Sequence, residues 1–68
     1  MGMSQYHRGE AGVARANAQR DYLLQHGSTS AAVEIDTVDG QVWGARVSVA
    51  DNDPTGRTFM MRYALGNS

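Results

Sequence analysis

The chain contains no cysteine, and this absence constrains a protein of 68 residues more than any other sequence feature. A domain of this size lies near the lower limit at which a hydrophobic core alone sustains folding, and disulfides or a cysteine-bound zinc ion are the usual reinforcements. Because the chain has no cysteine for either, oligomerisation is the remaining device, and we expect a single domain, residues 1–68, that forms a homodimer.

The expected location is the cytoplasm. No apolar run reaches the length of a membrane span, so no membrane partner is expected. The first residues lack the basic start and the apolar stretch of a secretory signal.

Residues 9–26 have the composition of a helix. The segment is rich in Ala and Leu, contains no proline, and is followed by Gly27, which suits the left-handed position that closes many helices. The residues that share one side of this helix have small side chains near its beginning and bulky side chains near its end. That side comprises Gly9, Gly12, Val13, Ala16, Leu23 and Leu24. Its small end would let the helix approach the sheet closely; the alternative is that the glycines are merely tolerated.

Three later segments alternate apolar and polar residues, as half-buried strands do. They span residues 31–37, 41–50 and 58–65, with turn-forming residues between them, whereas residues 1–8 are expected to be flexible. The register of the second hairpin is left open. The sequence therefore predicts an α+β fold, in which an N-terminal helix packs on one face of a three-stranded antiparallel meander in the order αβββ.

The first turn contains Asp39-Gly40, a dipeptide typical of a two-residue type I′ hairpin. That loop would place Ile35 opposite Gly44, so the apolar face of one strand would meet the polar face of the other. A loop one residue longer places Ile35 opposite Trp43 and keeps the apolar faces together. We therefore predict a type I turn closed by a bulge with Gly40 left-handed, and Trp43 in the core.

The same alternation divides the predicted sheet into two faces. The face toward the helix is apolar and forms the predicted core with the apolar side of the helix. Its members are Val33, Ile35, Trp43, Val47, Val49, Phe59, Met61, Tyr63 and Leu65, beneath Val13, Ala16, Leu23 and Leu24. Because one helix covers only one face, the other face and both edge strands are expected to be open to a partner.

No residue pattern indicates a catalytic, metal or cofactor site. His7 and His26 lack a third ligand at a recognised spacing, which favours structural roles. Residues 51–53, Asp-Asn-Asp, lack the length and the final Glu of an EF-hand, which favours a turn. Glu34 and Asp36 share a strand face, as acid–base pairs do, but a nearby arginine favours a solvated, ion-paired face. We therefore expect a protein that is not an enzyme, unless an oligomer builds a site between subunits.

The basic residues are six arginines and no lysine, and the formal net charge is −1. A GC-rich genome explains this usage, and a need for bidentate guanidinium contacts is the alternative. The charge balance argues against a protein held to nucleic acid by a broad positive field.

Two functions are compatible with these features. The first is a small non-catalytic protein-binding module, such as a phage- or plasmid-borne inhibitor or regulator of a bacterial host protein, acting through the open sheet face or an edge strand. Its candidate interaction surface mixes charge with a methionine, as interfaces do, and comprises Glu34, Asp36, Arg46, Met60 and Arg62. The alternative is a nucleic-acid-binding regulator that uses arginines of the sheet and the helix. Its contacts would be Arg46, Arg57 and Arg62 on the sheet, with Arg8, Arg15 and Arg20 on the helix.

Overall fold

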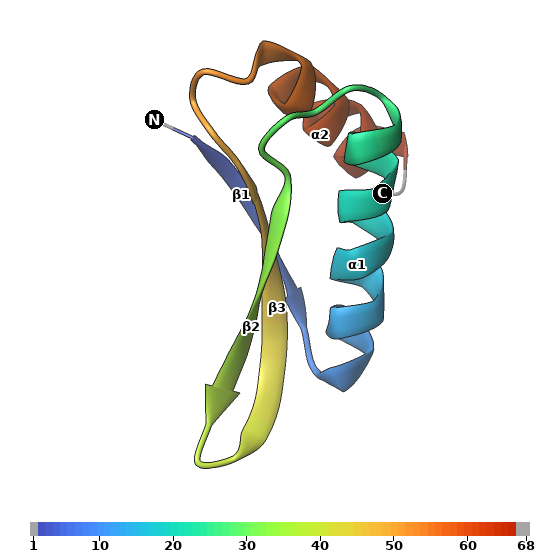
Figure 1. Cartoon of the computed structure of the whole chain (residues 1–68). Coiled ribbons are helices and arrows are strands. Elements are labelled where there is room, and N and C mark those ends of the chain that lie inside the picture. The colour runs from blue at the N-terminus through green and yellow to red at the C-terminus, as the bar shows by residue number, and fades with distance from the viewer. Residues whose placement is uncertain (1, 67–68) are drawn as a thin grey trace.

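A computed structural model describes residues 2–66 and contains five elements in the order βαββα. They are strand β1 (Met3–Arg8), helix α1 (Glu10–Gln25), strands β2 (Ala32–Val38) and β3 (Gln41–Val49), and helix α2 (Pro54–Gly66) (Figure 1). The strands form one antiparallel sheet in the order β1-β3-β2. The α+β class, with a helix on one face of a three-stranded antiparallel sheet, is confirmed, whereas the order αβββ is wrong.

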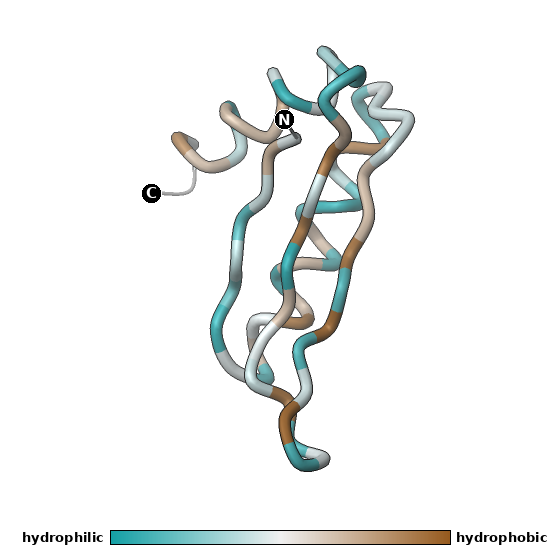
Figure 2. The backbone as a smooth tube through the Cα atoms, turned by 90° about the vertical axis from the view of Figure 1, so that its left-hand side faces the viewer, coloured by the Kyte–Doolittle hydropathy of each residue, from teal (hydrophilic) through white to brown (hydrophobic). Residues whose placement is uncertain are grey.

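Both helices lie on the same side of the sheet. α1 runs along the sheet, and α2 crosses near the end of α1 (Figure 1). Figure 2 looks onto the opposite side of the sheet, which no described element covers, and shows α2 extending past the β1 edge. In the described part of the chain, neither helix is long and apolar enough to cross a membrane.

Helix α1 closely matches its predicted limits and ends as expected at Gly27. The φ angle of Gly27 is 103°, and its N–H donates to the Leu24 carbonyl at 3.1 Å. The N–H of Ser28 donates to the Leu23 carbonyl at 3.0 Å, which completes a Schellman motif. A left-handed residue is needed here, and glycine adopts it without a steric penalty.

The third strand comes from the N-terminus and not from residues 58–65. β1 pairs with β3 along its whole length, with Tyr6 opposite Arg46 and Arg8 opposite Gly44. Residues 3–8 are therefore an ordered strand, and the prediction of a flexible N-terminal segment is wrong for them; Met1 lies outside the described residues.

Buried hydrogen bonds explain how β1 joins the sheet without an apolar alternation. Its helix-side positions include Gln5 and His7, and both reach Gln19 of α1, which is completely buried. The Gln19 amide donates to Gln5 Oε1 at 2.9 Å, and its carbonyl oxygen accepts from His7 Nε2 at 2.5 Å. The strand was missed because its inward residues are polar and become paired only in the tertiary structure.

Residues 58–65 belong to helix α2, because Asp53 and Pro54 form a helix start. Asp53 Oδ1 accepts a hydrogen bond from the Gly56 N–H at 2.9 Å, as an N-cap does, and Pro54 occupies the first helical position, where no N–H is required. The apolar residues of this segment fit both periodicities. Phe59 and Tyr63, for example, are four positions apart, which is an even number, as alternation in a strand requires, and also about one turn of a helix. The N-cap at Asp53 and the proline that follows it therefore favour a helix over a strand.

The carboxylate of Asp53 also anchors the loop that follows α1. Its Oδ2 accepts hydrogen bonds from the hydroxyls of Ser28 and Ser30 at 2.7 and 2.6 Å, and from the N–H groups of Thr29 and Ser30. The bond from Ser30, followed by those from the Gly56 N–H and Ser28, holds the pKa of Asp53 well below its ordinary value. The predicted turn at residues 51–53 is thus also a buried junction between two segments.

The β2–β3 turn corrects the predicted hairpin. Asp39 and Gly40 have φ angles of 52° and 77°, as the two-residue type I′ loop requires. The predicted three-residue loop is therefore wrong, but the prediction that Gly40 is left-handed is confirmed. Trp43 is an extra residue in β3 that lies opposite no β2 residue, and this bulge places Ile35 opposite Ala45. The apolar faces therefore match as required, but through a bulge within the strand.

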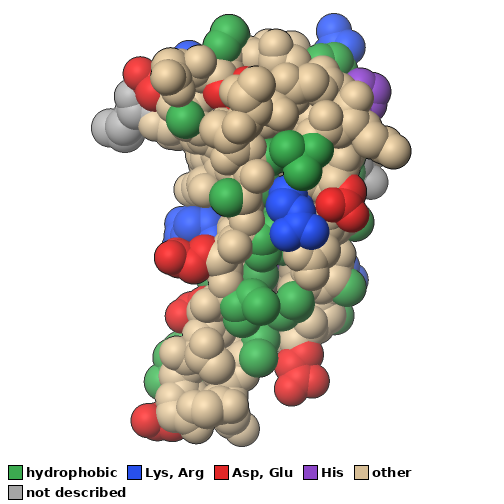
Figure 3. All heavy atoms as spheres, in the orientation of Figure 1, with side chains coloured by type: hydrophobic (Ala, Val, Ile, Leu, Met, Phe, Trp, Pro, Cys, Tyr) green, Lys and Arg blue, Asp and Glu red, His purple; other side chains and the backbone are tan. Residues whose placement is uncertain are grey.

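The end of the hairpin projects beyond α1 (Figure 1, Figure 3), and Trp43 is 55% exposed, not buried.

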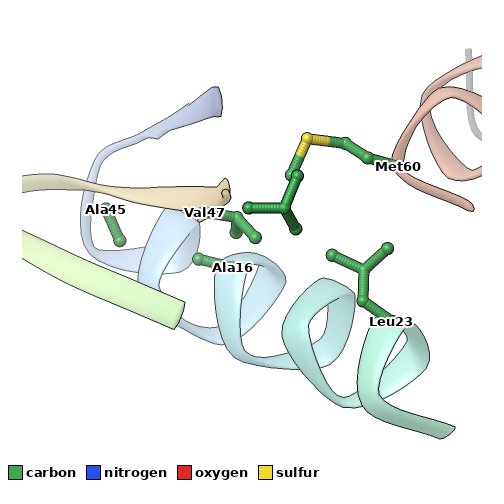
Figure 4. Packing of buried hydrophobic residues seen from close by; sticks show 6 residues of the cluster. Ala16, Leu23, Ala45, Val47 and Met60 are labelled. Carbon is green, nitrogen blue, oxygen red and sulfur yellow. The ribbon is translucent and has the colours of Figure 1, made fainter. Parts of the chain in front are cut away.

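The core is small and lies between α1, β3 and α2 (Figure 4). Its buried apolar members are Ala16, Leu23, Ala45, Val47, Val49 and Met60, and the partly buried residues against them include Val13, Val33 and Phe59. Five predicted core residues are instead exposed: Leu24, Ile35, Trp43, Met61 and Leu65. Met60 replaces Met61 because α2 is a helix, and Ile35 is open because α1 covers β1 and β3 more than β2.

Gly12 accounts for the close approach of α1 to the sheet. A Cβ atom at this position would collide with the carbonyl oxygen of His7. The small end of the helix therefore packs against the backbone of β1, and the expectation of a close helix–sheet contact is confirmed.

Aromatic rings join α2 to α1. The rings of His26 and Phe59 stack with their centroids 4.5 Å apart, and Tyr22 contacts Tyr63 with a separation of 5.0 Å. This contact and the buried Met60 attach α2 to the domain.

Adjacent leucines in α1 provide a matched test of the core. Leu23→Ala is expected to lower the free energy of unfolding by about 2–5 kcal/mol, because the side chain is fully buried and leaves a cavity. Leu24→Ala should cost no more than about 1 kcal/mol, because this side chain is 47% exposed. Urea unfolding followed by circular dichroism measures both, and equal losses would contradict the packing described.

The Asp53 junction predicts an acid-dependent contribution to stability. A carboxyl group whose pKa is lowered by folding stabilises the protein above its unfolded pKa of about 4, and this contribution is lost progressively as the pH falls below that value. Asp53→Asn should therefore lower the melting temperature at pH 7, and the difference from the unmodified protein should shrink at pH 3. The matched control is Asp51→Asn, an exposed neighbour. A difference that stays constant between the two pH values would exclude this role.

Candidate binding surface

The uncovered side of the sheet, here called the outer face, carries polar side chains from all three strands. By alternation from the buried positions, it comprises Ser4, Tyr6, Arg8, Glu34, Asp36, Gly44, Arg46 and Ser48. Because a sheet of three strands has two edge strands, β1 and β2 each also present one unpaired edge.

The centre of the outer face is organised by Tyr6. Its hydroxyl donates to Asp36 Oδ2 at 3.0 Å, although the two residues belong to the two edge strands. The tyrosine crosses the central strand over Gly44, where an added Cβ atom would lie 2.6 Å from its hydroxyl oxygen. Gly44 is therefore required for this contact, because any side chain there would displace the ring.

Arg46 interacts with β1 more closely than with β2. Its guanidinium carbon lies 5.5 Å from the centre of the Tyr6 ring, within cation–π range, and its Nη1 donates to Ser4 Oγ at 3.5 Å. Glu34 is directly opposite Arg46 in the strand register. Within residues 2–66, however, the Glu34 carboxylate makes no hydrogen bond and no ion pair. The expected ion-paired face is therefore not formed at this position.

The environment of Tyr6 raises the pKa of its hydroxyl above the ordinary value. Partial desolvation contributes most, followed by the hydrogen bond to Asp36 and the negative charge of that carboxylate. The positive charges of Arg46 and Arg8 act in the opposite direction.

Strand β2 forms the most exposed part of the surface. Every residue from Glu34 to Val38 is exposed. A shallow hollow of about 340 Å³ lies beside it, lined by Tyr6, Glu34, Ile35, Asp36, Thr37 and Arg46. In Figure 3 acidic side chains follow the side of the β2–β3 hairpin that faces away from α1.

The structure brings together three of the five predicted surface residues. Glu34, Asp36 and Arg46 share the outer face, whereas Met60 and Arg62 lie on α2. Met60 is 3% exposed in the core and is removed from the candidate surface. The error follows from assigning residues 58–65 to a strand.

The three arginines that the nucleic-acid alternative places on the sheet are divided between two elements. Arg46 is on the outer face, whereas Arg57 and Arg62 are on α2, on the other side of the sheet. Arg57 approaches Asp51 at 3.8 Å, and the Arg62 guanidinium carbon lies 5.1 Å from the centre of the Phe59 ring.

Sequence reasoning missed Tyr6 and the role of Gly44. Residues 3–8 have no apolar alternation that would have indicated a strand, but a glycine within the predicted strand 41–50 signalled a close approach by another group. Among residues 2–66, no three His, Asp or Glu side chains gather into a group that would hold a metal ion.

Comparison with known proteins gave no match: no protein-family model, no curated protein and no solved structure is significantly similar to this chain.

The tyrosine contact can be tested by titration. Asp36→Ala is expected to lower the pKa of Tyr6 toward its ordinary value, because the hydrogen bond and the nearby negative charge are both removed. The ¹³Cζ chemical shifts of labelled tyrosines, followed as a function of pH, separate Tyr6 from Tyr22 and Tyr63. Replacing Asp21, an exposed carboxylate of α1, by alanine is the control and should leave the Tyr6 titration unchanged. An unchanged titration in Asp36→Ala as well would show that the contact is absent in solution.

Proposed function

We propose that the protein is a small non-catalytic protein-binding module that inhibits or regulates a host protein, of the kind carried by phages and plasmids. The observation that supports this proposal is the one-sided architecture. Both described helices and the apolar core lie on one side of the sheet, which leaves the outer face and the β2 edge open. An open edge offers backbone hydrogen-bonding groups to a strand of another chain.

The size and the composition of the open surface suit a protein partner. A typical specific complex buries about 800 Å² on each partner, which is under a fifth of the 4523 Å² surface of this protein. Tyr6 and Arg46 lie at the centre of the outer face, and tyrosine and arginine are enriched among the residues that dominate protein interfaces.

The distribution of charge favours a protein partner over nucleic acid. The outer face places Glu34 and Asp36 beside Arg46, so phosphate groups would meet two carboxylates there. Arg57 and Arg62 do not extend this surface, because both lie on α2.

Site-specific photo-crosslinking tests the proposed surface. A photoreactive amino acid would replace Thr37 on β2, Ser4 on the outer face or, as the control, Gln25 on α1, all of which are exposed. In cells of the organism that encodes the chain, we expect the variants at 37 and 4 to give the same crosslinked protein and the variant at 25 to give little.

Crosslinks that form equally at all three positions, or chiefly at position 25, would refute this surface. A titration with labelled single- and double-stranded DNA and RNA tests the alternative. Salt-dependent binding that Arg46→Ala, Arg57→Ala and Arg62→Ala each weaken would replace the proposal with nucleic-acid recognition.

A further inference from the structure

The β2 edge carries negative charge and no positive charge. Glu34 and Asp36 lie on its outer face, and Asp39 follows in the turn, while residues 32–40 contain no Arg, Lys or His. The closest arginine in the register, Arg46, contacts Tyr6 and Ser4 of β1 instead of approaching the carboxylates of β2. The outer face is therefore divided, with its guanidinium group toward β1 and its carboxylates at the β2 edge.

Both outer carboxylates have capacity for further hydrogen bonds. Glu34 has no hydrogen-bond or ion-pair partner within residues 2–66, and Asp36 accepts the Tyr6 hydroxyl on Oδ2. An ionised carboxylate offers about four lone-pair sites, so most of this capacity is unused. The hollow of about 340 Å³ beside these residues has room for the end of a long side chain.

A second copy of the chain does not fit this edge. Two β2 strands related by a twofold axis pair antiparallel, and their outer faces match only when positions of the same parity are opposed. If the twofold axis passes through Ile35, Glu34 of one copy faces Asp36 of the other. If the axis passes through Glu34, the two copies of Glu34 face each other, and the same holds for Asp36. The remaining matched registers pair at most three residues of β2. Like charges directly opposite one another destabilise such pairs.

We propose that β2 binds, as a fourth strand of the sheet, an extended segment of a partner protein with Lys or Arg at two alternate positions and an apolar residue between them. This inference rests on the proposed protein-binding function and specifies its partner. Backbone hydrogen bonds to the open edge hold the segment, and its two basic side chains lie opposite Glu34 and Asp36. The intervening apolar residue lies against Ile35, which is on the helix side and 50% exposed.

Three synthetic peptides of equal length test the inference. The first has two lysines separated by one valine within a Thr-rich sequence, the second has glutamates in place of the lysines, and the third has the lysines adjacent. The third peptide cannot present both charges on one face of a strand. ¹⁵N-detected titrations of the whole protein measure affinity and locate the amide groups that shift.

The first peptide is expected to bind at least about tenfold more tightly than the other two at low salt, with the largest shifts in β2. The double variant Glu34→Gln/Asp36→Asn should lose about tenfold in affinity for it, since both carboxylates become neutral amides of similar size. The matched control is Glu10→Gln/Asp21→Asn, which removes the same charge from exposed positions of α1 and should bind as the unmodified protein does.

Equal binding of all three peptides, shifts centred on α1 or α2, or equal losses in the two double variants would each overturn the inference. The inference also falls if no peptide binds while crosslinks still map to Thr37 and Ser4, but the proposed function then stands. Concentration-dependent shifts in β2 of the protein alone would show instead that a second copy occupies the edge.

Discussion

The structure depends on the close packing of α1 against the central strand β3. Ala16 of the helix and Ala45 of the strand are completely buried, and Gly12 has no side chain to separate the helix from the backbone of β1. Small residues at these positions bring the helix and the sheet near enough for a thin core to exclude water. The other elements are attached to this pair: β1 and β2 by the strand ladders, and α2 through Met60 and the aromatic contacts.

Buried hydrogen bonds supplement this core. Gln19 joins α1 to two residues of β1, and Asp53 joins the start of α2 to the loop after α1. No buried side-chain nitrogen or oxygen atom in the described part of the chain is without a partner. Leaving such a group unpaired costs about 1–3 kcal/mol, so these residues favour the arrangement in which they are satisfied. Polar residues thus select the positions of β1 and α2, which apolar residues alone would leave undetermined.

The small size of the protein also explains why one surface of the sheet is open. The two helices and the small core occupy one side of the sheet, and the other side is stabilised by contacts among its own polar side chains. Tyr6 spans the sheet over Gly44 and draws Arg46 toward β1, which leaves Glu34 without a partner among the described residues. The contact of Arg46 with Tyr6 at the β1 side of the outer face therefore leaves the negative charge of Glu34 uncompensated at the β2 side. The candidate surface follows from the fold and does not require a separate structural element.

The sequence by itself determined the features that depend on neighbouring residues. The end of α1 at Gly27, the left-handed Gly40, and the shared face of Glu34, Asp36 and Arg46 were all predictable, because caps, turns and strand alternation act over a few positions. Only the tertiary structure decided that residues 3–8 are a strand, that residues 58–65 are a helix, and that a bulge at Trp43 restores the register. Each of these depends on groups distant in the sequence: Gln19 satisfies β1, Ser28 and Ser30 fix the Asp53 cap, and the buried face of β3 aligns β2. The periodicity of a short segment contains no information about partners distant in the sequence. It therefore could not predict whether these segments form a strand or a helix, or which register they adopt.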